Sequence, residues 1–150
     1  MDKQIRLTLT GCQRDENNNE TVTEQTADGE FYERNGSLDI LYEEKPDNGE
    51  RTTNRIKLKG SQLELLKKGS VNSCMVFEPG REHTADYATP FGLLRLGILT
   101  DSVELQQSED QLEITVNYTL TESGRNISFC NLSIKIQNRG KFIGLTSRYK

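Results

Sequence analysis

Residues 83–92, HTADYATPFG, contain the single histidine of this 150-residue chain, His83, close to Asp86 and Tyr87. Histidine titrates near neutral pH and often serves as a general base that a carboxylate orients. In an extended strand, however, successive side chains point to opposite faces, so His83 and Asp86, three positions apart, would diverge. The chain also has no Gly-x-Ser-x-Gly nucleophile motif. We expect His83 to be a polar strand residue, and we expect no catalytic residues and no enzymatic activity.

The chain also lacks the residue patterns that typically bind a metal ion or a cofactor. The chain contains three widely separated cysteines: Cys12, Cys74 and Cys130. With one histidine they form no zinc-ligand pattern, so we expect reduced thiols. The glycines form no phosphate-binding motif. The neighbouring carboxylates Glu43 and Glu44 would diverge in a strand, and those of Glu109 and Asp110 would repel each other in a turn. We therefore expect no metal and no cofactor.

Composition favours a single cytoplasmic domain over residues 1–150. No run of about 18 apolar residues is available to cross a membrane, and the N-terminal segment lacks the apolar core of a signal peptide. The charge is uneven, because residues 1–50 carry 13 acidic and 5 basic residues and residues 51–150 carry 10 and 14. The last sixteen residues form a basic tail that contains no acidic residue.

Alternation of apolar and polar residues is the dominant pattern of the chain. In QLEITVNYTL (111–120), Leu112, Ile114 and Val116 share one face, whereas Glu113 and Thr115 share the other. The same period of two recurs in five further segments: 4–9, 37–44, 54–60, 92–99 and 131–136. This pattern is typical of antiparallel strands with one buried face.

Turn residues separate the alternating segments. Asn35-Gly36 predicts a type I′ hairpin turn. Further turns are predicted at 46–49, 59–61, 67–70, 78–82 and 89–92. Short connections favour a meander, whose edges are best protected when the sheet closes. We therefore predict an all-β fold, a single antiparallel meander β-barrel of about 8–10 strands, calycin or lipocalin-like.

Some segments of the chain allow two interpretations. A capping box, Ser61-x-x-Glu64, allows a short helix over 61–67, but the flanking glycines lead us to favour a strand. Residues 101–110 allow a short helical turn. Gly97 is expected to mark a bend or bulge in its strand. The polar segment near 13–20 is expected to be a mobile loop.

Several pieces of the chain, in a fixed order, resemble one family. They are LYEE, IKLKG, LLKKG, CMVFEPG, ADYATPFG, LGILT, LEITVNYTL and LSIKI. Their order and spacing over residues 38–136 resemble the YwiB-like family, small bacterial proteins of unknown function with a calycin-type β-barrel. The resemblance implies a closed or nearly closed barrel in a cytoplasmic protein and supports a strand at 62–67. It implies no functional residues.

Other calycins differ from this chain in their characteristic residues. Lipocalins have a tryptophan near the first strand, whereas this chain has none. Fatty-acid carriers hold a carboxylate with an Arg-x-Tyr pair on the last strand. Here Arg148 and Tyr149 are adjacent, so in a strand they would point to opposite faces. The differences argue against lipid carriage of either kind.

The inward side chains of a barrel either fill it or line a cavity. Here they are mostly medium-sized aliphatic residues with few aromatic ones, which is compatible with a small apolar pocket. We therefore expect a non-enzymatic protein that binds a small, partly apolar ligand inside the barrel. Tyr42 and Tyr118 would offer hydrogen bonds, and Leu96, Ile98 and Ile114 would offer apolar contacts.

Two alternatives stay open. A solid interior would favour a self-associating protein-interaction module, for example a homodimer. A basic hairpin could instead bind a polyanion, together with the basic tail. It carries six cations: Arg51, Arg55, Lys57, Lys59, Lys67 and Lys68. The isoelectric point of about 5.1 argues against this alternative, so we do not expect nucleic acid as a partner.

Overall fold

The computed structural model describes residues 1–45, 49–69, 72–89 and 92–139, with the backbone alone for 87–89. These residues form ten strands: β1 (Gln4–Asp15), β2 (Glu20–Arg34), β3 (Ser37–Glu44), β4 (Thr52–Lys59), β5 (Gln62–Gly69), β6 (Ser73–Phe77), β7 (Glu82–Thr89), β8 (Gly92–Gln107), β9 (Gln111–Glu122) and β10 (Arg125–Asn138). The predicted all-β fold is therefore confirmed. Within the described ranges, no helix is long and apolar enough to cross a bilayer.

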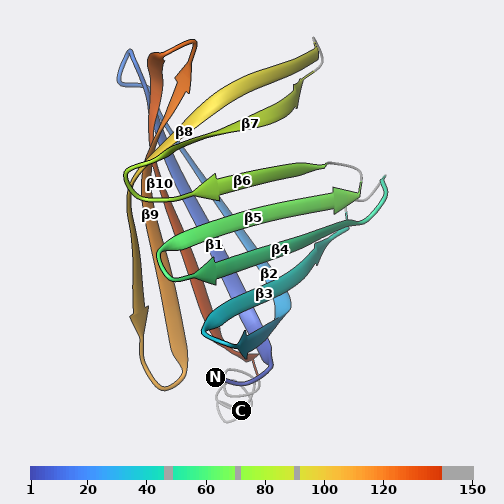
Figure 1. Ribbon diagram of the computed structural model, residues 1–150. Coiled ribbons are helices and arrows are strands. Elements are labelled where there is room, and N and C mark those ends of the chain that lie inside the picture. Colours follow the sequence, from blue (N-terminus) through green and yellow to red (C-terminus); the bar gives the residue numbers. More distant parts are fainter. Residues whose placement is uncertain (46–48, 70–71, 90–91, 140–150) are drawn as a thin grey trace.

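All ten strands belong to one antiparallel sheet. Their order is β6-β5-β4-β3-β2-β1-β10-β9-β8-β7, so nearly every strand pairs with its neighbours in sequence. The exception joins the two ends of the chain, where β1 pairs with β10 from Ile5↔Asn138 to Asp15↔Ser128. The outermost strands, β6 and β7, contact each other without a ladder between their described residues. The sheet is thus a meander that is nearly closed into a barrel, as predicted (Figure 1).

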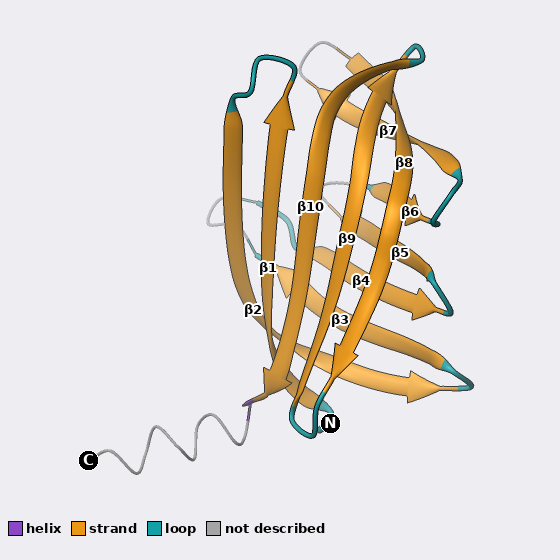
Figure 2. Ribbon diagram, turned by 90° about the vertical axis from the view of Figure 1, so that its left-hand side faces the viewer, coloured by secondary structure: helices purple, strands orange, loops and turns teal. Residues whose placement is uncertain are grey.

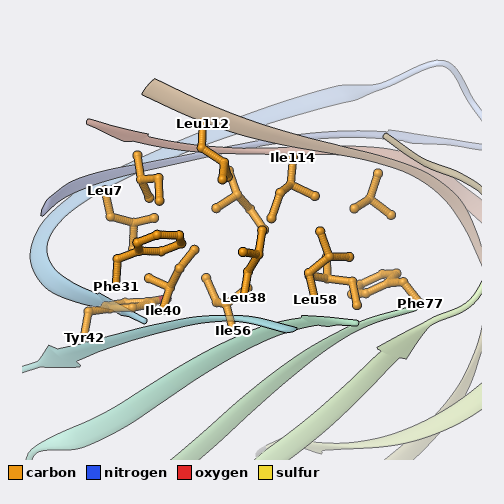
Figure 3. Close-up of a cluster of buried hydrophobic side chains, with 14 of the residues drawn as sticks. Leu7, Phe31, Leu38, Ile40, Tyr42, Ile56, Leu58, Phe77, Leu112 and Ile114 are labelled. Atoms are coloured by element: carbon orange, nitrogen blue, oxygen red, sulfur yellow. The ribbon is translucent and has the colours of Figure 1, made fainter. Parts of the chain in front are cut away.

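The sheet folds into two layers that enclose the core. Strands β1, β2, β8, β9 and β10 run side by side in one layer, and β3 to β6 cross behind them (Figure 2). Leu7, Leu112 and Ile114 point from the first layer toward the second (Figure 3), and all three are fully buried. The alternation predicted for 111–120 therefore places one face of β9 in the core, where removal of apolar surface from water stabilises the fold.

Gly29 lies where β2 passes from one layer to the other. Its backbone pairs with Ile5 on β1 and with Tyr42 on β3. A β-carbon at this position would lie 2.6 Å from the Leu41 carbonyl oxygen and 3.3 Å from the Tyr42 β-carbon. The inside of this bend therefore has no room for a side chain, a requirement that the alternation pattern does not reveal.

The turn at Asn35-Gly36 and the strand over 62–67 agree with the sequence. Asn35 and Gly36 have φ angles of 49° and 81°, in agreement with a type I′ turn. Residues 62–67 lie in β5, so the strand interpretation is confirmed. The predicted turns at 46–49, 67–70 and 89–92 lie partly outside the described residues. Residues 101–107 continue β8 and form no helical turn.

The connection between β1 and β2 is shorter than the loop expected near 13–20. Residues 13–15 are the end of β1, and Glu20 begins β2. One carboxylate oxygen of Asp15 accepts hydrogen bonds from the backbone N–H groups of Asn17 and Asn19, both at 2.9 Å. Such local bonding by an aspartate is typical of a tight turn and allows the flanking residues to pair as strands.

The structure places no bulge at Gly97, where a bend or bulge was expected. The register between β8 and β9 is regular at Gly97 and shifts instead between Thr100 and Ser102. A β-carbon at Gly97 would collide with the carboxylate of Glu82 and the hydroxyl of Thr121. These two groups form a hydrogen bond of 2.6 Å across the position. Gly97 therefore forms no bulge but leaves room for a cross-strand contact.

We predict that Gly29→Ala destabilises the protein by about 1–3 kcal/mol, because the new methyl group must displace the backbone of β3. Chemical denaturation of both proteins measures the free energy of unfolding. Gly11→Ala, another substitution inside a strand, is the control, since its methyl group would meet only the Thr23 hydroxyl, at 3.1 Å. Equal free energies for the two variants would contradict a special constraint at the bend.

Candidate functional site

A cavity of about 400 Å³ lies between the two layers, beside the packed core. Its apolar walls come from Leu9 on β1, Leu132 on β10, Ile56 on β4 and Leu65 on β5. Gly11 on β1 also lines it, and a β-carbon there would have only the Thr23 hydroxyl within 4 Å. The volume falls within the range of known ligand pockets, about 300–1,000 Å³.

Because side chains alternate along each strand, several polar side chains lie at one end of this cavity. The inward positions of β3, β4 and β5 are aliphatic toward the core and become polar near the end of β3. Tyr42, Asn54 and Lys67 form one cross-strand row, in which Tyr42 pairs with Asn54 and Asn54 pairs with Lys67. Glu44 follows Tyr42 by two positions and therefore faces the same side.

Three of these side chains, Glu44, Asn54 and Lys67, form one hydrogen-bonded group with Gln25 of β2, which we call the polar cluster. The Lys67 ammonium donates to Glu44 Oε1 at 2.7 Å and to Asn54 Oδ1 at 2.8 Å. Asn54 Nδ2 donates to the same Glu44 oxygen at 3.0 Å, and Gln25 Nε2 donates to Glu44 Oε2 at 2.9 Å. Three donors therefore converge on one carboxylate.

The cluster sets the charges at this end of the cavity. Burial raises the pKa of Glu44, but hydrogen bonds from Lys67, Asn54 and Gln25 outweigh it, so the pKa lies below the ordinary value. Burial, with a contribution from the Glu44 charge, raises the pKa of Tyr42 to about 12. Glu44 does not itself line the cavity, but it holds three residues that do, Gln25, Asn54 and Lys67. At neutral pH the cluster therefore contains an ionised carboxylate next to the lining Lys67 ammonium, and the Tyr42 phenol in the wall is neutral.

The structure separates the five side chains that were expected to contact a ligand. Tyr42 lines the cavity. Leu96, Ile98 and Ile114 are buried in the core, with exposed fractions of 6%, 0% and 0%, and do not line the cavity. Tyr118 also lies elsewhere, packed edge-on against Phe77 with ring centroids 4.8 Å apart. Ligand contact by these five residues stays a prediction, and the cavity supports it for Tyr42.

The polar cluster was missed by the sequence analysis, although a signal was present. Glu44, Asn54 and Lys67 each lie two positions from an apolar residue on the inward face of the same strand: Tyr42, Ile56 and Leu65. Extending the alternation by one step would have placed all three inside the barrel. Their convergence with Gln25 of β2 could not be read in this way, because the ladder between β2 and β3 ends at Gly29 and Tyr42 and does not fix the position of Gln25 relative to Glu44.

His83 and Asp86 diverge, as predicted. His83 Nε2 lies 2.9 Å from Glu78 Oε1, whereas Asp86 forms an ion pair of 3.0 Å with Arg95. Within the described residues, this contact with Glu78 is the one side-chain hydrogen bond of His83. The described ranges also contain no group of three His, Cys, Asp or Glu side chains suited to a metal ion. The absence of enzymatic activity stays a prediction.

The cations of the predicted basic hairpin point in different directions. Lys67 faces the interior, whereas Arg55 forms an ion pair of 3.0 Å with Asp39 and Arg51 lies 3.7 Å from Glu43. Three of the six cations thus have acidic partners. Most of the basic tail, residues 140–150, lies outside the described residues.

We predict that Glu44→Gln lowers the melting temperature at neutral pH and that the difference from the unchanged protein disappears in acid. Because folding lowers the pKa of Glu44, its charge contributes stability above the ordinary value of 4.5, and this contribution is lost as the pH falls through the lower folded pKa. Thermal melts across the acidic range measure the effect. Glu43→Gln is the control, and a difference that does not change with pH would contradict the assignment.

Comparisons with known proteins address the fold and the family. A crystal structure of the YwiB protein from Bacillus subtilis superposes with a TM-score of 0.77 and 22% sequence identity, over 91% of this chain and 92% of that one. At this identity the likeness shows the fold, and the calycin assignment stays a prediction. No curated protein matches the sequence. The model of one family, the domain of unknown function DUF1934, matches residues 7–134. The chain therefore belongs to the DUF1934 family, in agreement with the YwiB-like resemblance of its sequence.

Proposed function

We propose that this protein is a non-enzymatic cytoplasmic binding protein that takes up a small, partly apolar ligand in the cavity between its two layers. The observation that carries the proposal is the cavity of about 400 Å³, with Leu9, Ile56, Leu65 and Leu132 in its walls. Polar groups meet these apolar walls at one end. A mainly apolar pocket with a few placed polar groups is typical of sites for small molecules.

Gly11 supports the proposal because its position keeps part of the cavity open. It lies in the middle of β1, where glycine is unfavourable for strand stability. A side chain here would extend into the cavity rather than into the packed core, since one atom lies within 4 Å of the β-carbon position. A glycine at a position where it weakens the strand fits a site that accommodates another molecule.

The test is a titration with octan-1-ol, a probe that combines an apolar chain with one polar group. We predict saturable binding to the unchanged protein by calorimetry, together with a higher melting temperature. Gly11→Ile should abolish binding, because its side chain occupies the cavity while suiting a strand. Gly11→Ala is the matched control and should keep binding.

Two results would contradict this function. One is the absence of saturable binding to the unchanged protein. The other is equal affinity of the Gly11→Ile and Gly11→Ala variants, which would place the probe outside the cavity. Far-ultraviolet circular dichroism of each variant verifies that the β-structure is retained.

Self-association is a second candidate, favoured by apolar side chains on the outer face. Phe129 on β10 and Leu99 on β8 are 55% and 37% exposed. Both pair with Thr119 on β9, so they flank one position of the central strand. Exposed apolar groups that lie close together often mark protein contacts.

We predict a concentration-dependent dimer in sedimentation experiments, which Phe129→Ser weakens by removing apolar surface from the contact. Val22→Ser is the control, because Val22 is also exposed, at 62%, but lies on β2. A protein that stays monomeric at its highest attainable concentration would contradict this second candidate.

A further inference from the structure

We infer that the cavity selects ligands whose polar group is uncharged, such as an alcohol or an amide on an apolar chain. The inference rests on the proposed function, because it names the chemical class of the ligand that the cavity takes. It is carried by the charge balance of the polar cluster, its remaining hydrogen-bonding groups and the size of the cavity.

The charges at the polar end already neutralise each other. Glu44 and Lys67 form an ion pair of 2.7 Å, and about one third of each side chain is exposed. Lys67 lines the cavity, whereas Glu44 contacts Lys67 without lining the cavity itself. A ligand carboxylate at Lys67 would therefore meet a charge that Glu44 already balances, and a ligand ammonium drawn toward Glu44 would also meet Lys67. Either ion would lose hydration without gaining an unopposed partner, which is costly beside apolar walls.

The rim of the cavity does not change this balance. Glu24 and Arg55 also border it and carry opposite charges. Arg55 is held at 3.0 Å by Asp39, and Glu24 is exposed, so that water and salt screen its charge. Neither residue supplies a strong field that would favour an ionic ligand.

The protein groups that are still free to form hydrogen bonds match a ligand group that both donates and accepts. Lys67 has three N–H donors, of which Glu44 and Asn54 take two. The Tyr42 hydroxyl donates to no other described residue, and it stays protonated at neutral pH. Gln25 uses its amide nitrogen for Glu44, and among the described residues its carbonyl oxygen has no donor. With the second N–H of the Gln25 amide, three donors remain, and the oxygens of Gln25 and Tyr42 can accept, so a hydroxyl or an amide finds partners of both kinds.

The volume limits the length of the apolar chain. At about 30 Å³ for each water-sized group, 400 Å³ holds about 13 non-hydrogen atoms. A medium-chain amphiphile fits inside this space, whereas part of a long fatty acid would extend beyond it.

The experiment compares three probes with the same chain: octan-1-ol, octanoate and octylammonium. Calorimetry at neutral pH should show that the alcohol binds at least about tenfold more tightly than either ion. A tenfold difference in affinity corresponds to about 1.4 kcal/mol. This is a modest share of the cost of removing an ion from water. Equal affinities would overturn the inference while leaving the cavity as a binding site. No binding of any probe would overturn the proposed function as well.

Charge variants test whether the ion pair causes the selectivity. Glu44→Gln leaves the Lys67 charge unopposed and should shift the preference toward octanoate. Lys67→Met leaves the Glu44 charge unopposed and should shift it toward octylammonium. Glu43→Gln and Lys68→Met are matched controls. Each removes a charge of the same sign from the exposed position next to Glu44 on β3 or next to Lys67 on β5. Both should leave the preference among the probes unchanged.

The readout is the ratio of two affinities within one variant. A partly unfolded variant weakens all probes by the same factor, so the ratio still reports the selectivity. If both charge variants keep the preference of the unchanged protein, the ion pair does not select the ligand and the inference is wrong.

Discussion

The pleat of the β-strand is the constraint on which this structure depends. Each side chain faces opposite to its neighbours, and hydrogen bonding to adjacent strands holds that assignment over the full length of the strand. In β3, Leu38 and Ile40 must be buried between the layers. Tyr42 and Glu44, two and four positions further on, then face the interior as well. The force that buries the aliphatic residues thus also brings a carboxylate into the barrel.

A carboxylate in this position is tolerated because its neighbours supply donors. Asn54 is 2% exposed, and burying its amide without hydrogen bonds would be costly. It donates to Glu44 and accepts from Lys67, so that one side chain links the two charges. Lys67 and Glu44 keep partial contact with water, which limits the desolvation cost that fully buried ion pairs carry. The polar cluster is therefore a self-consistent group rather than a set of independent residues.

The sequence contained most of the fold but little of the site, and the reason is physical. Alternation depends on each residue and its near neighbours, so Leu112 and Ile114 predicted a buried strand face, and Asn35-Gly36 predicted a hairpin. The bend at Gly29 and the contact between His83 and Glu78 depend on which segments meet in space. Tyr42 and Tyr118 look equivalent in sequence, yet the structure places one at a cavity and the other against Phe77.

The position of the cavity follows from the sizes of the residues that oppose each other across the layers. Where Leu7 and Leu112 face the second layer, large side chains from both sides fill the space. Further along β1, the inward position is Gly11, whose partner on β2 is Thr23. In the opposite layer, Lys67 is drawn toward Glu44 and Asn54 and does not fill the gap. A missing side chain on one layer and an ion pair on the other together leave an apolar space that ends in polar groups, which is the arrangement that a small amphiphilic ligand requires.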